Sequence, residues 1–394
     1  MNIAIAALTA PNSLNGVSRH AINLCRALLE HDAAERVHLL IGAWQLDMLK
    51  QASRLSDSRL KVHAVPCGDS SLSRLCWYYR DLPHIVEQLK ADIVHIACPV
   101  PLRARAFPCP IVLTLHDMYP FEIPSNFGTV KGRLARLIVR RAVRNSDAVA
   151  CVSESTRAAL QRILPADAGK AVVIPNAVAA LSCSVSRRPS AAPESQFILC
   201  VAQHRANKNL RLVVRIFERA LRGKILDRKA SLVLVGIEGP ESEQLRRMIV
   251  HLRLQRHVIL ARGLHDGELR WCYQNAAALL APSLTEGFGY PVAEALMEGC
   301  PVVCSDIPAF REAGGDSCHF VPFGDGAVQG YLDALQSCIS EPRPRPVSMQ
   351  QFSPRNVGYR YMQLYGKVTG QGEARSVTLP HTYVETAGRG ASRS

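Results

Sequence analysis

Short apolar runs alternate with longer amphipathic segments along most of this chain. The runs at residues 2–8, 111–115, 197–201 and 231–236 are rich in branched side chains, and each is short enough for a strand that a sheet buries on both faces. Segments with helical spacing follow them, beginning with residues 17–30. Strands and helices that alternate in this way predict an α/β fold built on parallel sheets.

The same pattern divides the chain into two domains. Residues 182–195 are rich in Ser, Pro and Ala, which is typical of a linker, and 394 residues are too many for one ordinary domain. We therefore expect a first domain at residues 1–178, a linker at 179–195, a second domain at 196–345, a final helix at 346–369 and a disordered tail at 370–394. Further strands are expected at 37–41, 60–65, 92–96, 147–153, 172–175, 258–260 and 276–281, and further helices at 77–90, 129–145, 154–160, 210–221, 263–275 and 352–368.

Residues 285–299, TEGFGYPVAEALMEG, carry the strongest chemical signal. An apolar run precedes them, and Pro291 stands where a helix accepts proline, so the stretch predicts a strand, a Gly-rich loop and a helix N-terminus. Such a terminus offers unpaired N–H groups to a phosphate. Glu286 lies at the strand end, where α/β sheets bind ligands, and Glu294 is expected in the first helical turn. An acidic residue there also complements the helix dipole, so Glu294 alone decides nothing.

Three other segments are placed to bind a ligand. His116 and Asp117 follow the run at 111–115, at the edge of a sheet where ligands bind, although an isolated His is more often structural. Lys208 lies near the start of the helix at 210–221, with Arg205 close by. Gly16 lies in the loop between the first strand and the first helix, where an ordinary turn glycine is an equal alternative.

Glu286 and Glu294, with Gly-Phe-Gly and Pro between them, resemble the signature of retaining GT-B glycosyltransferases, specifically glycosyltransferase family 4. The segments CPVVCSDIPAFREAGG, SESTRAAL and VIPNAV are similar to the same family, and so is the Lys208-Asn209 pair. The family usually has Gly at Ala202 and often Arg at Gln203, so Arg205 is inferred as the second cation. The resemblance implies two Rossmann-like parallel-sheet domains that face a central cleft, with a C-terminal helix that returns to the N-terminal domain.

The resemblance also implies roles for individual residues. It implies a nucleotide-sugar donor whose diphosphate lies near cations and backbone amides, and the residues expected there are Arg205, Lys208, Gly287, Phe288, Gly289 and Gly16. Glu294 is expected to hold the ribose, and Glu286 the hydroxyls of the sugar. His116 is expected to lie against the transferred sugar. The expected catalytic residues are therefore His116, Glu286 and Lys208.

The expected reaction is transfer of a hexose, with retention, to a lipid-linked or oligosaccharide acceptor in surface polysaccharide or glycolipid assembly. Family analogy favours mannose from GDP-mannose, with a UDP-linked donor also open. The chain contains no Asp-x-Asp, so we expect neither a metal site nor any cofactor besides the donor. Two other functions stay open: a GT-B-fold nucleotide-sugar 2-epimerase, and a non-catalytic module that binds polyanions.

The net charge of +14 favours an anionic partner. No nucleic-acid-binding motif is present, so we expect a phosphorylated substrate or a membrane surface and no nucleic acid. Residues 129–145 combine basic and apolar side chains at helical spacing and contain no acid: Lys131, Arg133, Arg136, Arg140, Arg141 and Arg144, with Val130, Leu134, Leu137 and Ile138. This helix is expected either to lie on anionic lipid or to pack its apolar side on the core.

The N-terminal residues lack the pattern of a signal peptide, and no apolar stretch approaches about 20 residues. Thirteen cysteines occur without a C-x-x-C pair, which favours reduced thiols. We therefore expect a cytoplasmic protein that is peripheral on the inner face of the cytoplasmic membrane.

Overall fold

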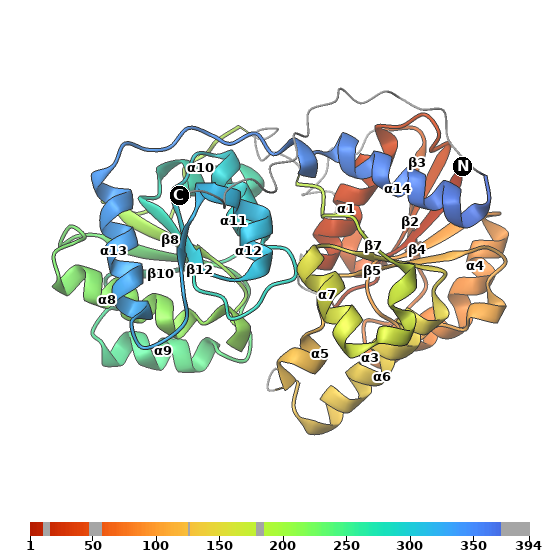
Figure 1. Ribbon diagram of the computed structural model, residues 1–394, viewed down its shortest axis with the longest axis horizontal. Coiled ribbons are helices and arrows are strands. Elements are labelled where there is room, and N and C mark those ends of the chain that lie inside the picture. The colour runs from red at the N-terminus through yellow and green to blue at the C-terminus, as the bar shows by residue number, and fades with distance from the viewer. Residues whose placement is uncertain (11–15, 47–56, 125–126, 179–184, 372–394) are drawn as a thin grey trace, which may run out of the picture.

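Branched apolar runs form two parallel sheets, one in each half of the chain (Figure 1). The computed structural model describes residues 1–10, 16–46, 57–124, 127–178 and 185–371. The first sheet has seven strands in the order β3-β2-β1-β4-β5-β6-β7, and the second has six in the order β10-β9-β8-β11-β12-β13. All of these strand pairs are parallel, as the alternating pattern predicts.

The first sheet and its helices use residues up to 173. The strands are β1 (Asn2–Ala6), β2 (Arg36–Gly42), β3 (Leu60–Val65), β4 (Ile93–Ile96), β5 (Ile111–Leu115), β6 (Ala148–Cys151) and β7 (Ala171–Val173). The helices are α1 (Gly16–Leu29), α3 (Ser71–Cys76), α4 (Leu82–Gln88), α5 (Tyr119–Glu122), α6 (Thr129–Asn145) and α7 (Glu154–Ile163).

The second sheet begins at residue 197. Its strands are β8 (Phe197–Val201), β9 (Ser231–Val235), β10 (Val258–Ala261), β11 (Ala278–Ala281), β12 (Val302–Ser305) and β13 (His319–Val321). The helices are α8 (Leu210–Arg222), α9 (Ser242–His251), α10 (Asp266–Asn275), α11 (Tyr290–Met297), α12 (Pro308–Gly314), α13 (Ala327–Ser340) and α14 (Pro354–Thr369).

The helix predicted at 77–90 differs most from the structure. The segment expected at 77–90 begins earlier, at Ser71, because the Ser70 hydroxyl accepts a hydrogen bond from the Ser73 amide and caps the helix N-terminus. Trp77–Asp81 then forms a π-helical turn before α4. Leu82 follows this turn directly, and Pro83, which has no N–H to donate, is the second residue of α4.

The last helix returns to the first domain, as expected, and lies beside α1 (Figure 1). Gly358 permits this packing, because a Cβ at that position would overlap the backbone carbonyl of Ala27 in α1. Tyr361 and Tyr365 of α14 are fully buried, and the Tyr365 hydroxyl lies 2.7 Å from Nδ1 of His95. The C-terminal helix is therefore part of the first domain's core.

The order of strands decides where loops from distant parts of the chain meet. β1 lies between β2 and β4, and β8 lies between β9 and β11, so the order of connection reverses at these central strands. In open parallel sheets, ligands bind outside the carboxyl ends of the strands at such reversals. The loops after β1, β4, β8 and β11 are therefore the natural place for a site, and the loop after β5, the neighbour of β4, lies next to them.

Candidate active site

Three of the predicted residues lie just after the carboxyl ends of strands in the two sheets. His116 directly follows β5, Glu286 lies in the loop after β11, and Lys208 ends a single 3-10 turn, Ala206–Lys208, after β8. Asn209 adopts the left-handed conformation, with φ of 50°, and α8 begins at the next residue. Lys208 therefore precedes the helix at the end of a tight turn.

Glu286 and Lys208 form an ion pair within the second domain. The Lys208 Nζ lies 2.5 Å from Oε1 of Glu286, whose side chain is only 9% exposed. The Ser283 hydroxyl donates to the same oxygen at 2.7 Å, and the Tyr119 hydroxyl of the first domain donates to Oε2 at 3.4 Å. Next to this pair, the buried Oδ1 of Asn207 has no hydrogen-bond partner in the described part of the chain. The pair is thus held in place and keeps an open acceptor beside it.

His116 is a neutral acceptor in this geometry. Its Nε2 lies 2.9 Å from the carbonyl oxygen of Ala97, which can only accept, so Nε2 carries the hydrogen. Burial lowers the pKa of His116 to about 4, so the ring is neutral near pH 7 and Nδ1 keeps its lone pair. Asp117 accepts a hydrogen bond from the Tyr119 amide at 3.0 Å, just before α5, and burial raises its pKa to about 6.

Two more histidines lie behind His116. The rings of His20 and His116 are 4.9 Å apart, edge to face. The Thr114 hydroxyl lies between Nε2 of His20, at 3.1 Å, and Nε2 of His95, at 2.7 Å. Burial lowers the pKa of His95 to about 3 and that of His20 well below 6.5. The wall behind His116 is therefore uncharged, and Tyr365 of α14 completes it.

The glycine loop contacts the first domain closely. A Cβ at Gly287 would overlap the carbonyl oxygen of His116, and the Thr156 hydroxyl lies 3.3 Å from the carbonyl oxygens of both residues. Gly289 has φ of +98°, which disfavours any other residue. Phe288 packs its ring against Tyr290 and Phe352 in the core, so only its backbone faces outward. The need for glycine at position 287 thus comes from domain contact.

Glu294 lies deeper than expected. It is the fifth residue of α11, which has no acidic residue in its first turn, so the expectation of a first-turn position was wrong. Its side chain is 3% exposed: Arg19 Nη1 of α1 lies 2.9 Å from Oε1, and the Tyr273 hydroxyl donates to Oε2 at 3.0 Å. Burial raises the pKa of Glu294, and the positive charge of Arg19 opposes that shift.

The remaining predicted residues are less constrained. Gly16 is the first residue of α1, and nothing lies within 4 Å of the place where a Cβ would be. Most of the loop before it, residues 11–15, lies outside the described residues. Arg205 is exposed, and its positive charge counteracts the effect of burial on the pKa of Asp117. Arg205 is therefore close enough to act on this site electrostatically.

Sequence reasoning missed Arg19, Tyr119, Tyr273 and Ser283. Tyr119 and Ser283 each lie three positions from a predicted residue, so proximity was their only signal. Arg19 and Tyr273 reach Glu294 from α1 and α10, and no local motif marks them. Such partners can be identified only from the tertiary structure, in which the two domains pack together.

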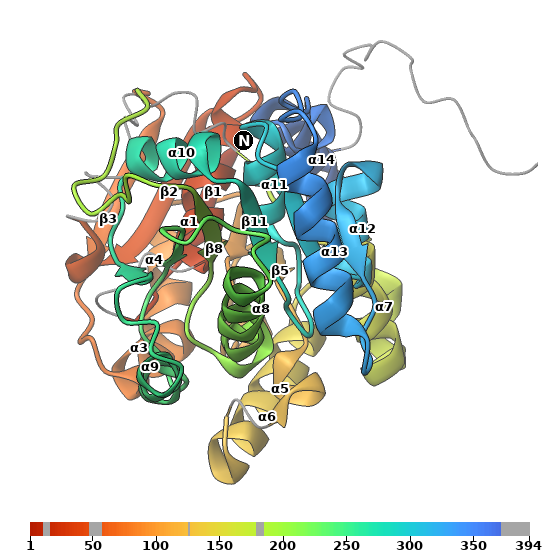
Figure 2. The same cartoon turned by 90° about the vertical axis from the view of Figure 1, so that its left-hand side faces the viewer.

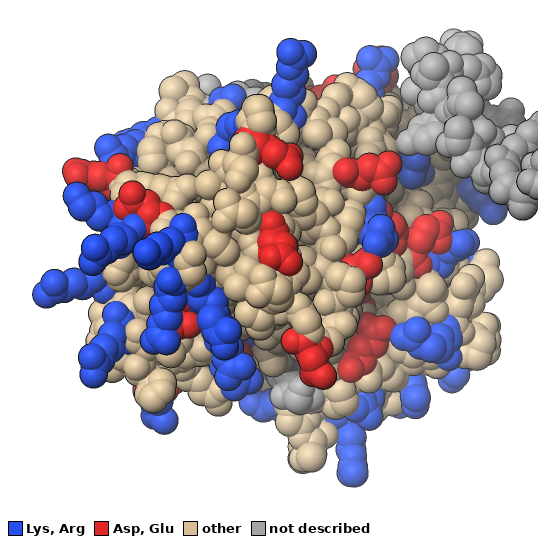
Figure 3. All heavy atoms as spheres, turned by 60° about the vertical axis from the view of Figure 1, so that its left-hand side comes forward, with Lys and Arg blue, Asp and Glu red and all other residues tan. Residues whose placement is uncertain are grey.

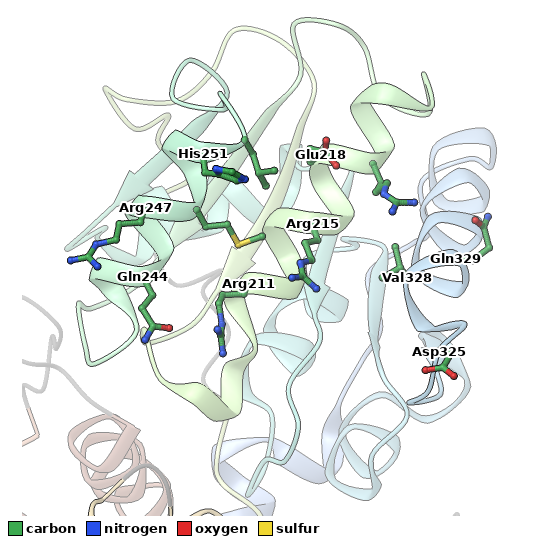
Figure 4. A pocket seen from close by; sticks show the side chains of 12 residues that line it. Arg211, Arg215, Glu218, Gln244, Arg247, His251, Asp325, Val328 and Gln329 are labelled. Atoms are coloured by element: carbon green, nitrogen blue, oxygen red, sulfur yellow. The ribbon is translucent and has the colours of Figure 1, made fainter.

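A basic groove lies elsewhere, on the second domain (Figure 4), and Lys and Arg side chains gather on one side of the face seen in Figure 3. Its volume is about 850 Å³, and it runs between α8, α9 and the start of α13. Arg211, Arg215 and Arg219 line it from α8, and Arg247 and His251 from α9. None of the predicted site residues lines this groove, so it is separate from the candidate active site.

Helix α6 presents its predicted apolar stripe to the outside. Val130 is 78% exposed, Leu134 52% and Leu137 45%, while the helix buries Gly132, Val139, Ala142 and Val143 instead. The helix lies at the lower tip of the first domain in Figures 1 and 2. The alternative in which this stripe packs on the core is therefore wrong for these three residues. Among the described residues, every helix is too short or too polar to span a bilayer.

Two family comparisons together cover most of the chain. Residues 14–180 match the model described as Glycosyltransferase Family 4, and residues 185–347 match the one described as Glycosyl transferases group 1. The boundary between the two matches falls between the two sheets. Both halves therefore point to the same group of proteins.

Individual relatives are distant. The chain is 28% identical over 200 residues to the O-antigen chain mannosyltransferase RfbU of Salmonella typhimurium, a match that spans 51% of this chain and 53% of that protein. It is 23% identical over 342 residues to the O-antigen chain mannosyltransferase B of Escherichia coli, which covers 80% of this chain and 85% of the relative. The first match thus spans about half the length of the relative.

Solved structures share the fold. WaaG, a glycosyltransferase involved in lipopolysaccharide biosynthesis, superposes with a TM-score of 0.64 at 16% identity, over 94% of this chain and 98% of that one. Anabaena HepE in complex with UDP and glucose gives a TM-score of 0.61 at 17% identity, over 93% and 95%. At these identities the likeness concerns the arrangement of the two domains.

Proposed function

The chain belongs to the GT-B glycosyltransferases of family 4 and group 1, and on this basis we propose that it is a retaining glycosyltransferase in surface polysaccharide or glycolipid assembly. It transfers a hexose from a nucleotide-sugar to a lipid-linked or saccharide acceptor. One observation carries the proposal: the Lys208–Glu286 pair of the second domain contacts Tyr119 of the first, and the neighbouring Gly287 lies against the carbonyl of His116. A donor and an acceptor held by different domains would meet there.

The chemistry follows from the charges at this interface. Glycosyl transfer passes through an oxocarbenium-like state, and the leaving nucleoside diphosphate gains negative charge. Lys208 offsets that charge, with Arg205 and the backbone amides of residues 287–289 and Gly16 as further donors. Glu286 accepts hydrogen bonds from the hydroxyls of the sugar. Glu294 accepts hydrogen bonds from the ribose.

His116 contributes an acceptor and no positive charge. Its Nε2–H is used by Ala97, and its neutral Nδ1 keeps a lone pair. We propose that Nδ1 accepts a hydrogen bond from a hydroxyl of the transferred sugar. A neutral ring also avoids repelling the positive charge that develops on the sugar.

For the donor we propose GDP-mannose. Two relatives are named as O-antigen chain mannosyltransferases, which supports mannose, whereas the structure of HepE holds UDP and glucose, which keeps a UDP-linked donor as the competing choice. Thermal shift against GDP, UDP, ADP, CDP and TDP separates them. A ligand at one hundred times its Kd should add about 2.7 kcal/mol to the free energy of unfolding.

Product analysis tests the reaction itself. With the preferred donor and an oligosaccharide acceptor, we expect an elongated acceptor with the anomeric configuration of the donor retained. Without an acceptor, we expect at most slow hydrolysis. An epimerised nucleotide-sugar in that second reaction would overturn the proposal in favour of a 2-epimerase, and anion binding without turnover would favour a binding module.

We also propose that transfer needs no divalent ion, because Lys208 and Arg205 supply positive charge for the leaving diphosphate. Turnover should then persist after treatment with EDTA and should not rise when Mg²⁺ or Mn²⁺ is restored. Loss of turnover on chelation, with recovery on adding one of these ions, would contradict this.

For the acceptor side we propose that α6 contacts anionic lipid on the inner face of the cytoplasmic membrane. Its exposed apolar residues lie among basic side chains, and each basic residue near such a surface contributes about 1 kcal/mol. Phosphatidylglycerol vesicles should then sediment the protein and phosphatidylcholine vesicles should not.

A double substitution tests the apolar part of this contact. Leu134→Ser with Leu137→Ser should reduce sedimentation with phosphatidylglycerol vesicles and leave the melting temperature nearly unchanged, because both side chains are exposed. Val250→Ser, which alters an exposed valine on α9 of the second domain, is the matched control and should have no effect. Equal binding of the double variant would overturn the role of α6.

A further inference from the structure

Both oxygens of the Glu294 carboxylate are already in use. Arg19 Nη1 lies 2.9 Å from Oε1, and the Tyr273 hydroxyl donates to Oε2 at 3.0 Å. Only 3% of the side chain is exposed. A ribose diol that approaches this carboxylate therefore meets a guanidinium that occupies one of its two oxygens.

The two partners of Glu294 differ in origin. Tyr273 belongs to α10, in the same domain as Glu294, and moves with it. Arg19 belongs to α1 of the other domain, and its side chain is 34% exposed. Of the two, Arg19 is the partner that a change in the distance between the domains removes.

Arg19 also has a second carboxylate within reach. Its Nη2 lies 3.8 Å from Oδ1 of Asp266, which is 45% exposed, and its guanidinium lies 5.9 Å from the centre of the Tyr290 ring. Both neighbours belong to the second domain, so a guanidinium that swings away from Glu294 while the domains stay in contact keeps an acidic neighbour and an aromatic face. Release from Glu294 therefore costs less than the loss of a sole partner would.

We propose that Arg19 belongs to the nucleotide-sugar site. While the site is empty, its guanidinium binds the Glu294 oxygen that the ribose would use, and it leaves this oxygen when the nucleotide binds. The proposal rests on the proposed role of Glu294 as the ribose acceptor. Guanidinium N–H groups and ribose hydroxyls are both donors, so they compete for the same carboxylate oxygen. Nucleotide binding is thereby coupled to the position of α1, and hence to the contact between the two domains.

The competition predicts that removal of Arg19 strengthens nucleoside binding. An ion pair with one partly exposed member is worth up to about 1 kcal/mol, which corresponds to a two- to fivefold change in Kd. Calorimetry with the nucleoside of the preferred base, which carries no phosphate, isolates the ribose contact. Arg19→Ala should lower the Kd of this nucleoside two- to fivefold.

Two further variants separate competition from a structural role. Arg19→Gln keeps a donor toward Glu294 without the charge, so it should give a smaller decrease in Kd. In a Glu294→Gln background, which weakens nucleoside binding by itself, Arg19→Ala should change the Kd little. A purely structural Arg19 would lower the melting temperature in each case without strengthening binding. Arg26→Ala, two turns along α1, is the matched control.

Each result decides between clear outcomes. An unchanged or raised Kd for Arg19→Ala, with wild-type binding intact, overturns the competition and leaves the donor site standing. Equal strengthening in the wild-type and Glu294→Gln backgrounds overturns it as well. If neither the wild-type protein nor any variant binds a nucleoside or nucleotide, the proposed donor site fails, and the role of Arg19 fails with it.

Discussion

Glu286 and Glu294 lie eight positions apart in one loop and helix, yet they are held in different ways. Glu286 is paired with Lys208 of its own domain, and Ser283 donates to the same oxygen. Glu294 is paired with Arg19 of the other domain. The first carboxylate is thus preorganised within one domain, whereas the environment of the second depends on how the domains meet.

The walls that face these carboxylates also differ. Glu286 faces Tyr119 and the charge of Asp117, both in the first domain, and burial raises the pKa of Asp117 to about 6. Glu294 faces Arg19, which stays positively charged at every ordinary pH. We therefore expect the surroundings of Glu286 to respond to pH and those of Glu294 to respond to the relative position of the domains.

The largest effect is expected from breaking the preorganised pair. Lys208→Met removes the cation that offsets charge on the leaving group, so turnover should fall about 100- to 1000-fold. Glu286→Gln should also reduce turnover strongly, because the variant loses the charge that orients Lys208. Steady-state kinetics measures both. Arg211→Ala, in the basic groove of the second domain, is the control, and a loss of turnover of similar size in this variant would contradict the assignment.

The next largest effect is on how the free energy of unfolding depends on pH, where Asp117 and His116 act in opposite directions. The folded pKa of Asp117 lies above its ordinary value of 3.8, so its stabilisation is complete below about pH 4 and is lost as pH rises through about 6. The folded pKa of His116 is depressed, so its contribution is present above 6.5 and is lost as pH falls through about 4.

These signs predict the behaviour of two variants. Asp117→Asn keeps an acceptor for the Tyr119 amide and should be more stable than the wild type at pH 8, by up to about 3 kcal/mol, but not at pH 4. His116→Gln should lose less stability than the wild type when the pH falls from 6.5 to 4. Melting temperatures across this range test both, and parallel wild-type and variant profiles would refute the assigned burial effects.

A smaller effect is expected where the glycine loop meets the first domain. Gly287→Ala would place a methyl group against the His116 carbonyl, and because backbone cannot yield easily, we expect a loss of about 1–3 kcal/mol. Gly16→Ala meets open space and should stay within about 0.5 kcal/mol of the wild type. Denaturant titration measures both, and equal losses would show that the contact is not the cause.

The smallest effect concerns a second contact between the domains. Glu312 of α12 accepts hydrogen bonds from the amides of Glu154 and Ser155, at 2.7 and 2.8 Å, and so caps α7 across the interface. Glu312→Ala should cost about 1 kcal/mol, as loss of a helix cap does. Melting temperature is the readout, with Glu243→Ala on exposed α9 as the control. An unchanged value would show that the α7 amides find other acceptors.

Local pattern determined much of this protein. Three elements have the predicted bounds: the strands Ile111–Leu115 and Phe197–Val201 and the helix Thr129–Asn145. The pattern of apolar and polar side chains within a short segment is enough to predict a buried strand or an amphipathic helix. The glycine loop and its two glutamates were also visible in sequence, since backbone freedom and acidic chemistry are properties of single residues.

Tertiary structure decided the partners. Arg19 and Glu294, Tyr119 and Glu286, and Gly287 and His116 come from different domains, so no window of sequence contains both members of a pair. The outward direction of Leu134 and Leu137 was likewise open, because an apolar stripe on a helix fits a core or a surface equally well. Only the packing of the two sheets determines which side chains share an interface, and burial and charge at that interface then set their chemistry.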